Sequence, residues 1–273
     1  MDARTRLLML RGLLWGLLIA WGWKWNYLLP AYNIYDLRPL DVPFFPAWLE
    51  CAEVYGILYV APVLVSLVGF LRNRPGAYGA ALGAFAVCAS LMLLHQGTYN
   101  DATYVTAFWV ALIGLWAYRA SAHPAHDFRQ RLGFLSQLLI GLLFLGGIVG
   151  KLTPGYFDGT VLYEIYFKER QYFTFRLVRA LVEPEQLATA AKLYSWMVLA
   201  VEASLASLPM WPTRPALVVA IFALGGLVVF NNTSLASVVV SVMGLAAVSL
   251  WLERVPAEST DVHAPARIHR QGT

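Results

Sequence analysis

The sequence predicts an all-α integral membrane protein, a polytopic helical bundle of about eight transmembrane helices plus an interfacial helix. Hydrophobic residues make up 59% of its 273 residues and charged residues only 13%, about half the charged share of a soluble domain. The apolar residues form continuous runs of about 17 to 23 residues, long enough for a helix to cross the hydrocarbon core. These runs do not alternate apolar and polar residues as membrane β-strands do, and helices satisfy their own backbone hydrogen bonds in lipid.

Eight apolar runs are the predicted spans, at residues 7–27, 54–71, 77–94, 103–118, 132–150, 190–208, 216–230 and 234–252. The first is predicted to be a retained anchor rather than a cleaved signal peptide, because it continues into Trp21, Trp23 and Trp25 without a small-residue cleavage site. We interpret these tryptophans as an interfacial aromatic belt. Only residues 231–233 separate the last two runs, which predicts either a tight hairpin or one long, broken helix.

The basic residues predict the orientation of the chain. Short loops rich in Lys and Arg stay on the cytoplasmic side. Basic residues begin the first run and recur in every second loop, so they fall on one side of the membrane: Arg4, Arg6, Arg11, Arg72, Arg74, Arg119, Arg129, Arg131, Arg214 and Arg254. Both termini are therefore predicted to be cytoplasmic. Segment 151–185 mixes basic and aromatic residues, which is typical of a helix lying in the membrane interface.

The chain is predicted to consist of a membrane domain at residues 1–253 and a polar, disordered cytoplasmic tail at residues 254–273. The net charge of +4 lies mostly at the predicted cytoplasmic loop ends, so membrane orientation explains it. The predicted partner is therefore the lipid bilayer, and no nucleic-acid partner is predicted. Cys51 and Cys88 lack the spacing of a metal site, and no metal is predicted.

One group of candidate ligand-binding residues is the polar turn between the third and fourth runs. It contains His95, Tyr99, Asn100 and Asp101. If these side chains point back into the bundle, their hydrogen-bonding groups suit a small polar ligand. The alternative is a solvated outer turn.

Lys151 and Glu202 are the second group of candidates. Lys151 ends an apolar run just before a Gly/Pro-rich turn that contains Tyr156, a further ligand-binding candidate. A lysine at that position has two interpretations. It either interacts favourably with the helix dipole and extends to the lipid headgroups or, if desolvated, serves as a neutral amine base. Glu202 lies within a run, where an ionisable side chain is a functional candidate by default. Its alternative is a protonated carboxyl hydrogen-bonded to a neighbouring helix.

Two motifs resemble the membrane domain of vitamin K-dependent γ-carboxylases and their bacterial relatives, the horizontally transferred transmembrane (HTTM) family. They are the Tyr99-Asn100-Asp101 turn with the apolar run after it, and the Gly-x-x-Gly-Lys-Leu-x-x-x-Tyr-x-x-Gly sequence at residues 147–159. Residues 231–243 are loosely similar to the closing segment of that family. The resemblance implies a multi-pass protein of the bacterial inner (plasma) membrane that uses a quinone or quinol of the vitamin K class.

In the carboxylases, a lysine at the position of Lys151 is assigned as the base that deprotonates vitamin K hydroquinone. The resemblance therefore implies that Lys151 is a catalytic base and that Asn100 belongs to its polar surroundings. The sequence departs from the family at Ala102, where the polar turn of the family has a histidine. It also lacks the large extramembrane domain that binds the protein substrate, so carboxylation of a protein is not expected.

Two function classes follow from these observations. The first is an HTTM-like membrane protein that binds a quinone or another lipid-soluble small molecule near its outer face, with a carboxylase-like enzyme as its catalytic form. The second is a non-catalytic membrane subunit that stabilises or positions a membrane protein partner. A transporter is disfavoured, because the sequence shows neither a clear internal repeat nor paired broken helices.

Overall fold

The computed structural model describes residues 1–25, 45–98, 101–124, 127–168, 173–231 and 235–255. All regular elements in these residues are helical. The long helices are α1 (Ala3–Trp23), α3 (Ala52–Arg72), α4 (Pro75–Leu93), α5 (Ala102–Ala120), α6 (Phe128–Lys151), α10 (Leu187–Ala206), α11 (Thr213–Gly226) and α12 (Ala236–Arg254). The short ones are η1 (Ala47–Leu49), α7 (Pro154–Phe157), α8 (Thr160–Leu162), η2 (Tyr163–Lys168), α9 (Phe173–Leu181), η3 (Pro184–Gln186), η4 (Leu208–Met210) and η5 (Leu227–Asn231).

Five of these helices, α1, α3, α4, α6 and α12, are long and apolar enough to cross a membrane. The protein is therefore a polytopic helical membrane protein. Helices α5, α10 and α11 occupy the other three predicted runs, but they are less apolar or shorter. Helices α11 and α12 pack against each other, so the last two runs form a hairpin rather than one broken helix.

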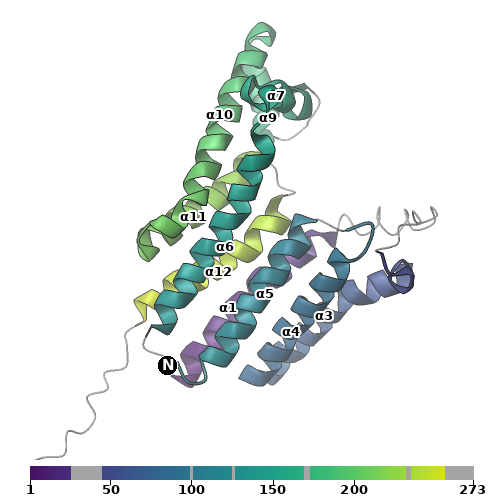
Figure 1. Cartoon of the computed structure of the whole chain (residues 1–273), viewed down its shortest axis with the longest axis vertical. Helices are drawn as coiled ribbons and strands as arrows, with labels where there is room; N and C mark the ends of the chain where they lie inside the picture. The colour runs from purple at the N-terminus through teal and green to yellow at the C-terminus, as the bar shows by residue number, and fades with distance from the viewer. Residues whose placement is uncertain (26–44, 99–100, 125–126, 169–172, 232–234, 256–273) are drawn as a thin grey trace, which may run out of the picture.

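Helices α1 and α12 pair at the centre of the bundle, although they come from opposite ends of the chain (Figure 1). Glycines permit their close approach. A Cβ atom at Gly244 would lie 2.9 Å from the Cα of Gly16, and one at Gly12 would lie 2.5 Å from Cγ2 of Val248. Small residues spaced four apart are the usual device for such contacts between membrane helices. The glycines thus let the backbones of α1 and α12 approach closely at these positions.

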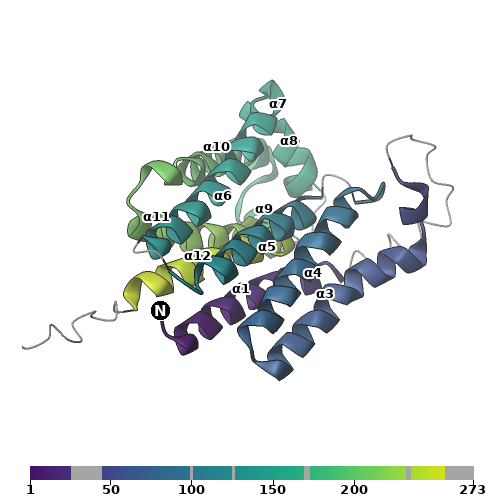
Figure 2. The ribbon, with the colours of Figure 1, turned by 60° about the horizontal axis from the view of Figure 1, so that its bottom comes forward.

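Two groups of helices flank this pair (Figure 2). Helices α3, α4 and α5 pack in sequence beside α1, while α6 and α11 pack against α12 and α10 packs against α6. The largest fully buried side chains include Tyr78, Phe85 and Tyr104. The core therefore lies where the α1–α12 pair meets the α3–α5 group.

Trp21 belongs to this core, and its assignment to an interfacial belt was wrong. The side chain is fully buried, and its indole N–H donates to the carbonyl of Tyr59 at 2.9 Å. The Tyr59 hydroxyl donates in return to the carbonyl of Trp21 at 2.6 Å. Because α3 satisfies its polar group, the indole does not need the membrane surface. Trp23 and Trp25 are exposed, as a belt requires.

The arginines predicted on one face gather at one end of the bundle. Arg6, in the first turn of α1, donates to the Ser121 hydroxyl at 3.0 Å, just after α5 ends. Arg214, at the start of α11, donates to the carbonyl of Glu253 at 3.1 Å, near the end of α12. We call this end of the molecule the basic end, and the opposite end the polar-turn end.

The segment predicted as one interfacial helix consists of several short elements. Thr153 is extended before α7, and Gly159 has a φ of 87° between α7 and α8, so no continuous helix forms. Helix α9 has the expected two-sided character. Its Phe175 is buried against the protein, while Phe173 and Leu181 are exposed.

Candidate functional site

Lys151 and Glu202 form an ion pair between α6 and α10. The Lys151 ammonium lies 2.8 Å from Oε1 and 2.9 Å from Oε2 of Glu202. It also donates to the carbonyl of Gly147, one turn earlier in α6, at 3.3 Å. The Glu202 side chain is 9% exposed and that of Lys151 28%. The carboxylate is therefore enclosed, while part of the lysine chain faces outward.

The turn after Lys151 is held against α10 at a glycine. Gly159 has a positive φ of 87°, and a Cβ there would lie 2.5 Å from both N and Cα of Lys192. No other residue type fits this contact. Next to it, the Asp158 carboxylate accepts the Thr160 N–H at 2.8 Å, and hydrogen bonding by the Thr160 side chain, together with this backbone bond, lowers the pKa of Asp158. The turn thus brings α7 and α8 beside the ion pair.

Tyr156 is the third sequence candidate in this group. It is buried with Leu162, Val198 and Leu199. Burial and the nearby Glu202 carboxylate raise the pKa of Tyr156 well above its ordinary value. Its hydroxyl therefore stays protonated and uncharged.

An apolar pocket of about 460 Å³ lies next to this group. Its lining comes from η2, α9, α10, the end of α11 and the start of η5 and does not include Lys151, Tyr156 or Glu202; the lining residues are Phe167, Thr174, Phe175, Val178, Tyr194, Met197, Val198, Val201, Ala223, Gly226 and Leu227. On α10, the lining residues Val198 and Val201 stand four residues and one residue before Glu202. The pocket and the carboxylate therefore occupy adjacent faces of the same turns of α10.

His95 and Asp101 lie in a separate group at the polar-turn end. His95 is fully buried, and its Nε2 lies 3.6 Å from Oε2 of Glu50. Its Nδ1 accepts the Gly97 N–H at 3.1 Å, and Glu50 also accepts the Gln96 N–H at 2.9 Å. Burial lowers the pKa of His95, and the Glu50 carboxylate only partly opposes this shift. A neutral imidazole with its proton on Nε2 fits these contacts.

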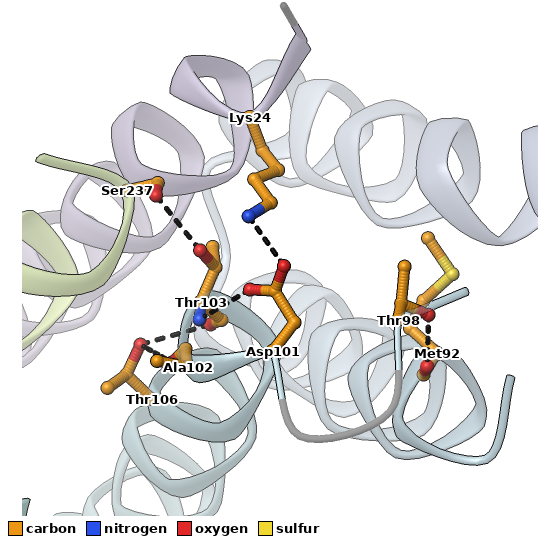
Figure 3. Close-up of polar contacts among 8 residues, drawn as sticks. All are labelled: Lys24, Met92, Thr98, Asp101, Ala102, Thr103, Thr106 and Ser237. Carbon is orange, nitrogen blue, oxygen red and sulfur yellow. Dashed lines mark hydrogen bonds and ion pairs between the residues drawn. The ribbon is translucent and has the colours of Figure 1, made fainter. Parts of the chain in front are cut away.

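Asp101 begins α5 and pairs with α1 (Figure 3). Its carboxylate accepts the Thr103 N–H at 2.9 Å and lies 2.5 Å from the Lys24 ammonium. The Thr103 hydroxyl donates to Ser237 of α12 at 2.9 Å. Asp101 and Thr103 therefore tie the start of α5 to both central helices.

Further hydroxyl–carbonyl hydrogen bonds lie within α4, α5 and the turn between them (Figure 3). Thr106 donates to the carbonyls of Ala102 and Thr103, and Thr98 donates to the carbonyl of Met92. Ala102, the position at which the carboxylase family has a histidine, has an exposed side chain. These bonds stabilise the ends of α4 and α5.

The structure thus divides the sequence candidates into two groups. Lys151, Glu202 and Tyr156 come together where α6 meets α10. His95 and Asp101 instead pair with Glu50 and Lys24, and candidates 99 and 100 lie outside the described residues. Sequence reasoning did not assign Glu50 or Lys24 to the site. The only sequence feature that could have identified these two residues is a charge next to an apolar run.

Within the described residues, no three His, Cys, Asp or Glu side chains gather as a metal site. Comparison of the chain with known protein families, curated proteins and solved structures gives no match. The resemblance to the HTTM family therefore stays a prediction.

Proposed function

We propose that this protein binds a lipid-soluble molecule with a polar head, of the quinone or quinol class, at the Lys151–Glu202 pair. The observation that carries the proposal is the partly buried ion pair on α6 and α10, next to a largely apolar pocket of about 460 Å³. Ligand pockets commonly combine such an apolar wall with a few polar groups that orient the ligand. Charged groups at membrane depth are costly, so an ion pair there favours a functional role.

The roles of the residues follow from their chemistry. In this proposal a polar head that extends beyond the apolar pocket hydrogen-bonds to the 28% exposed Lys151 side chain and to the protonated Tyr156 hydroxyl. Glu202 holds the ammonium from the enclosed side. The lining of the pocket, from Phe167 to Leu227, would contact the ring or the tail of the ligand.

A base role for Lys151 requires a neutral amine. The short Nζ to Oε1 distance of 2.8 Å offers a route, since the ammonium passes one proton to Glu202 and becomes an amine. The amine then accepts a proton from an acidic hydroxyl in the site and is an ammonium again. A quinol supplies such a hydroxyl. This reaction type rests on the resemblance to the carboxylases.

We further propose eight spans, with the basic end of the bundle in the cytoplasm. Helices α5 and α10, of 19 and 20 residues, are long enough to cross most of the hydrocarbon core. The gathering of arginines at one end supports the orientation through the positive-inside rule. The Lys151–Glu202 pair then belongs to the outer half of the membrane, and the membrane is the bacterial inner membrane implied by the resemblance.

The ligand proposal is tested by filling the pocket. Met197 lines it and is 52% exposed, whereas Leu193, one turn earlier in α10 and 67% exposed, does not line it. Met197→Trp should reduce binding of menaquinone by protein in lipid nanodiscs, while Leu193→Trp should bind like wild type. Equal binding by both variants would contradict the pocket as the site.

A non-catalytic subunit is the second candidate function. The observation that favours it is the two-sided helix α9, where Phe173 and Leu181 are 73% and 76% exposed while Phe175 is buried. Such a two-sided helix offers a docking surface for another membrane protein. Phe173→Ser with Leu181→Ser would release a copurifying protein without changing menaquinone binding if this candidate is correct. Retention of that protein by the double variant would contradict it.

A further inference from the structure

Helices α5 and α6 run side by side with an open groove between them that the proposed ligand site does not use. The groove is apolar and has a volume of about 460 Å³. On α5, its lining residues Val105, Trp109 and Ile113 form one helical stripe. The facing stripe on α6 is leucine-rich, formed by Leu135, Leu138, Leu139, Leu142 and Leu143.

The groove continues into a wider hollow at the basic end. This hollow has a volume of about 770 Å³ and shares Leu135 with the groove. Trp116 lies one turn beyond Ile113 on α5, and Arg131 lies one turn before Leu135 on α6. Helices α5 and α6 therefore contribute to both parts, which share Leu135, and the lining changes from apolar to polar toward the basic end.

The wall opposite α6 is fixed in place. The buried Gln137 side chain donates from Nε2 to the carbonyls of Leu208 and Trp211, each at 3.1 Å. These bonds tie α6 to the connection between α10 and α11, whose Pro209, Trp211 and Pro212 line the hollow. The hollow is thus a preformed feature of the fold rather than a gap between loosely packed helices.

We propose that this groove binds one anionic phospholipid of the leaflet at the basic end. From Arg131 to Leu143 the α6 face is about 18 Å long, close to the roughly 15 Å of one leaflet's hydrocarbon. The leucine stripe therefore suits an acyl chain, and the wider hollow takes the head group. Trp116 and Trp211 lie at the hollow, and tryptophan favours the headgroup level of a membrane.

The charges at the mouth favour an acidic head group over a zwitterionic one. Arg131 lines the hollow, and its side chain is 65% exposed even though it pairs with Asp127 at 2.6 Å. An exposed ion pair of this kind contributes little, so the guanidinium remains available to a phosphate. Arg119, at the end of α5, and Arg129, at the start of α6, add positive charge near the hollow without lining it, and Asp127, which does line it, is the single acidic residue between 119 and 131.

Native mass spectrometry of protein released from nanodiscs of phosphatidylglycerol and phosphatidylethanolamine tests the acyl-chain part. Leu142 and Leu145 are 59% and 51% exposed on α6, but only Leu142 lines the groove. Wild type should retain one phosphatidylglycerol. Leu142→Trp should lose most of it, whereas Leu145→Trp should retain it. Equal retention by the two variants would overturn the groove as the binding site.

The head-group part is tested by Arg131→Gln, with Arg72→Gln as the control at the same end of the bundle. One basic residue at a membrane surface changes anionic lipid binding by about fivefold. Arg131→Gln should therefore lower the preference for phosphatidylglycerol by about that factor, and Arg72→Gln should leave it unchanged. An unchanged preference in Arg131→Gln, or equal retention of both lipids by wild type, would overturn an anionic ligand. Menaquinone binding should be unaffected by all four variants.

Discussion

Removing one or both partners of the Lys151–Glu202 pair measures what their contact contributes. Lys151→Met leaves the Glu202 carboxylate, 9% exposed, without the ammonium that lies 2.8 Å away. Leaving a buried charge unpaired costs about 3 to 5 kcal/mol, and the 28% exposure of Lys151 places this case near the lower value. Glu202→Leu should cost less, about 1 to 2 kcal/mol, since the lysine chain then extends toward the headgroups.

The double variant decides whether these costs come from the contact. Lys151→Met with Glu202→Leu leaves no charge unpaired, and apolar replacement of a buried pair is often nearly neutral. We therefore expect a loss of about 1 kcal/mol or less and a coupling free energy of about 3 kcal/mol. The assay is reversible unfolding in mixed micelles of dodecyl maltoside and SDS, followed by circular dichroism. A double-variant loss equal to the sum of the single losses would refute the buried pair.

Three further predictions concern other parts of the fold. Gly244→Leu should lower the folded yield strongly, because even a Cβ there would lie 2.9 Å from the Cα of Gly16; a wild-type yield would contradict the close helix contact. Because burial lowers the pKa of His95, its stabilising effect is complete above the unfolded pKa of about 6.5 and is lost as the pH falls below it. Wild type should thus lose more thermal stability than His95→Gln between pH 7.5 and 5.5, and parallel losses would remove His95 as the cause. Cysteines introduced at Leu37 and Asn73 should be labelled from opposite sides of the membrane; labelling from the same side would contradict the topology.

The helices were predictable because the lengths of the apolar runs determine them. Each of the eight runs contains a helix in the structure, and five of these helices meet the length and composition of a membrane span. Lys151 and Glu202 could be singled out for the same reason, since ionisable residues stand out in apolar surroundings. Their pairing could not be predicted, because they are 51 residues apart in the sequence. Whether they meet depends on how α6 and α10 are rotated about their axes.

At other positions, the sequence could not predict the direction in which a side chain points. Trp21 and Trp25 are four residues apart in a similar local sequence, yet one is fully buried and the other 56% exposed. Tyr59 of α3 packs against both rings, but Phe85 of α4 and Tyr104 of α5 pack against Trp21 as well. Likewise, His95 was identified without Glu50, because its partner comes from the segment before α3.

Binding of menadiol to wild type, Lys151→Arg and Lys151→Met in nanodiscs, at matched folded yield, tests the central proposal most directly. A hydrogen bond to a charged group contributes about 1.5 to 3 kcal/mol, so Lys151→Met should bind about tenfold to a hundredfold more weakly than wild type. Lys151→Arg keeps the charge but offers no neutral amine near pH 7, so it should retain binding and lose any turnover. Wild-type affinity in Lys151→Met would contradict a ligand site at the Lys151–Glu202 pair.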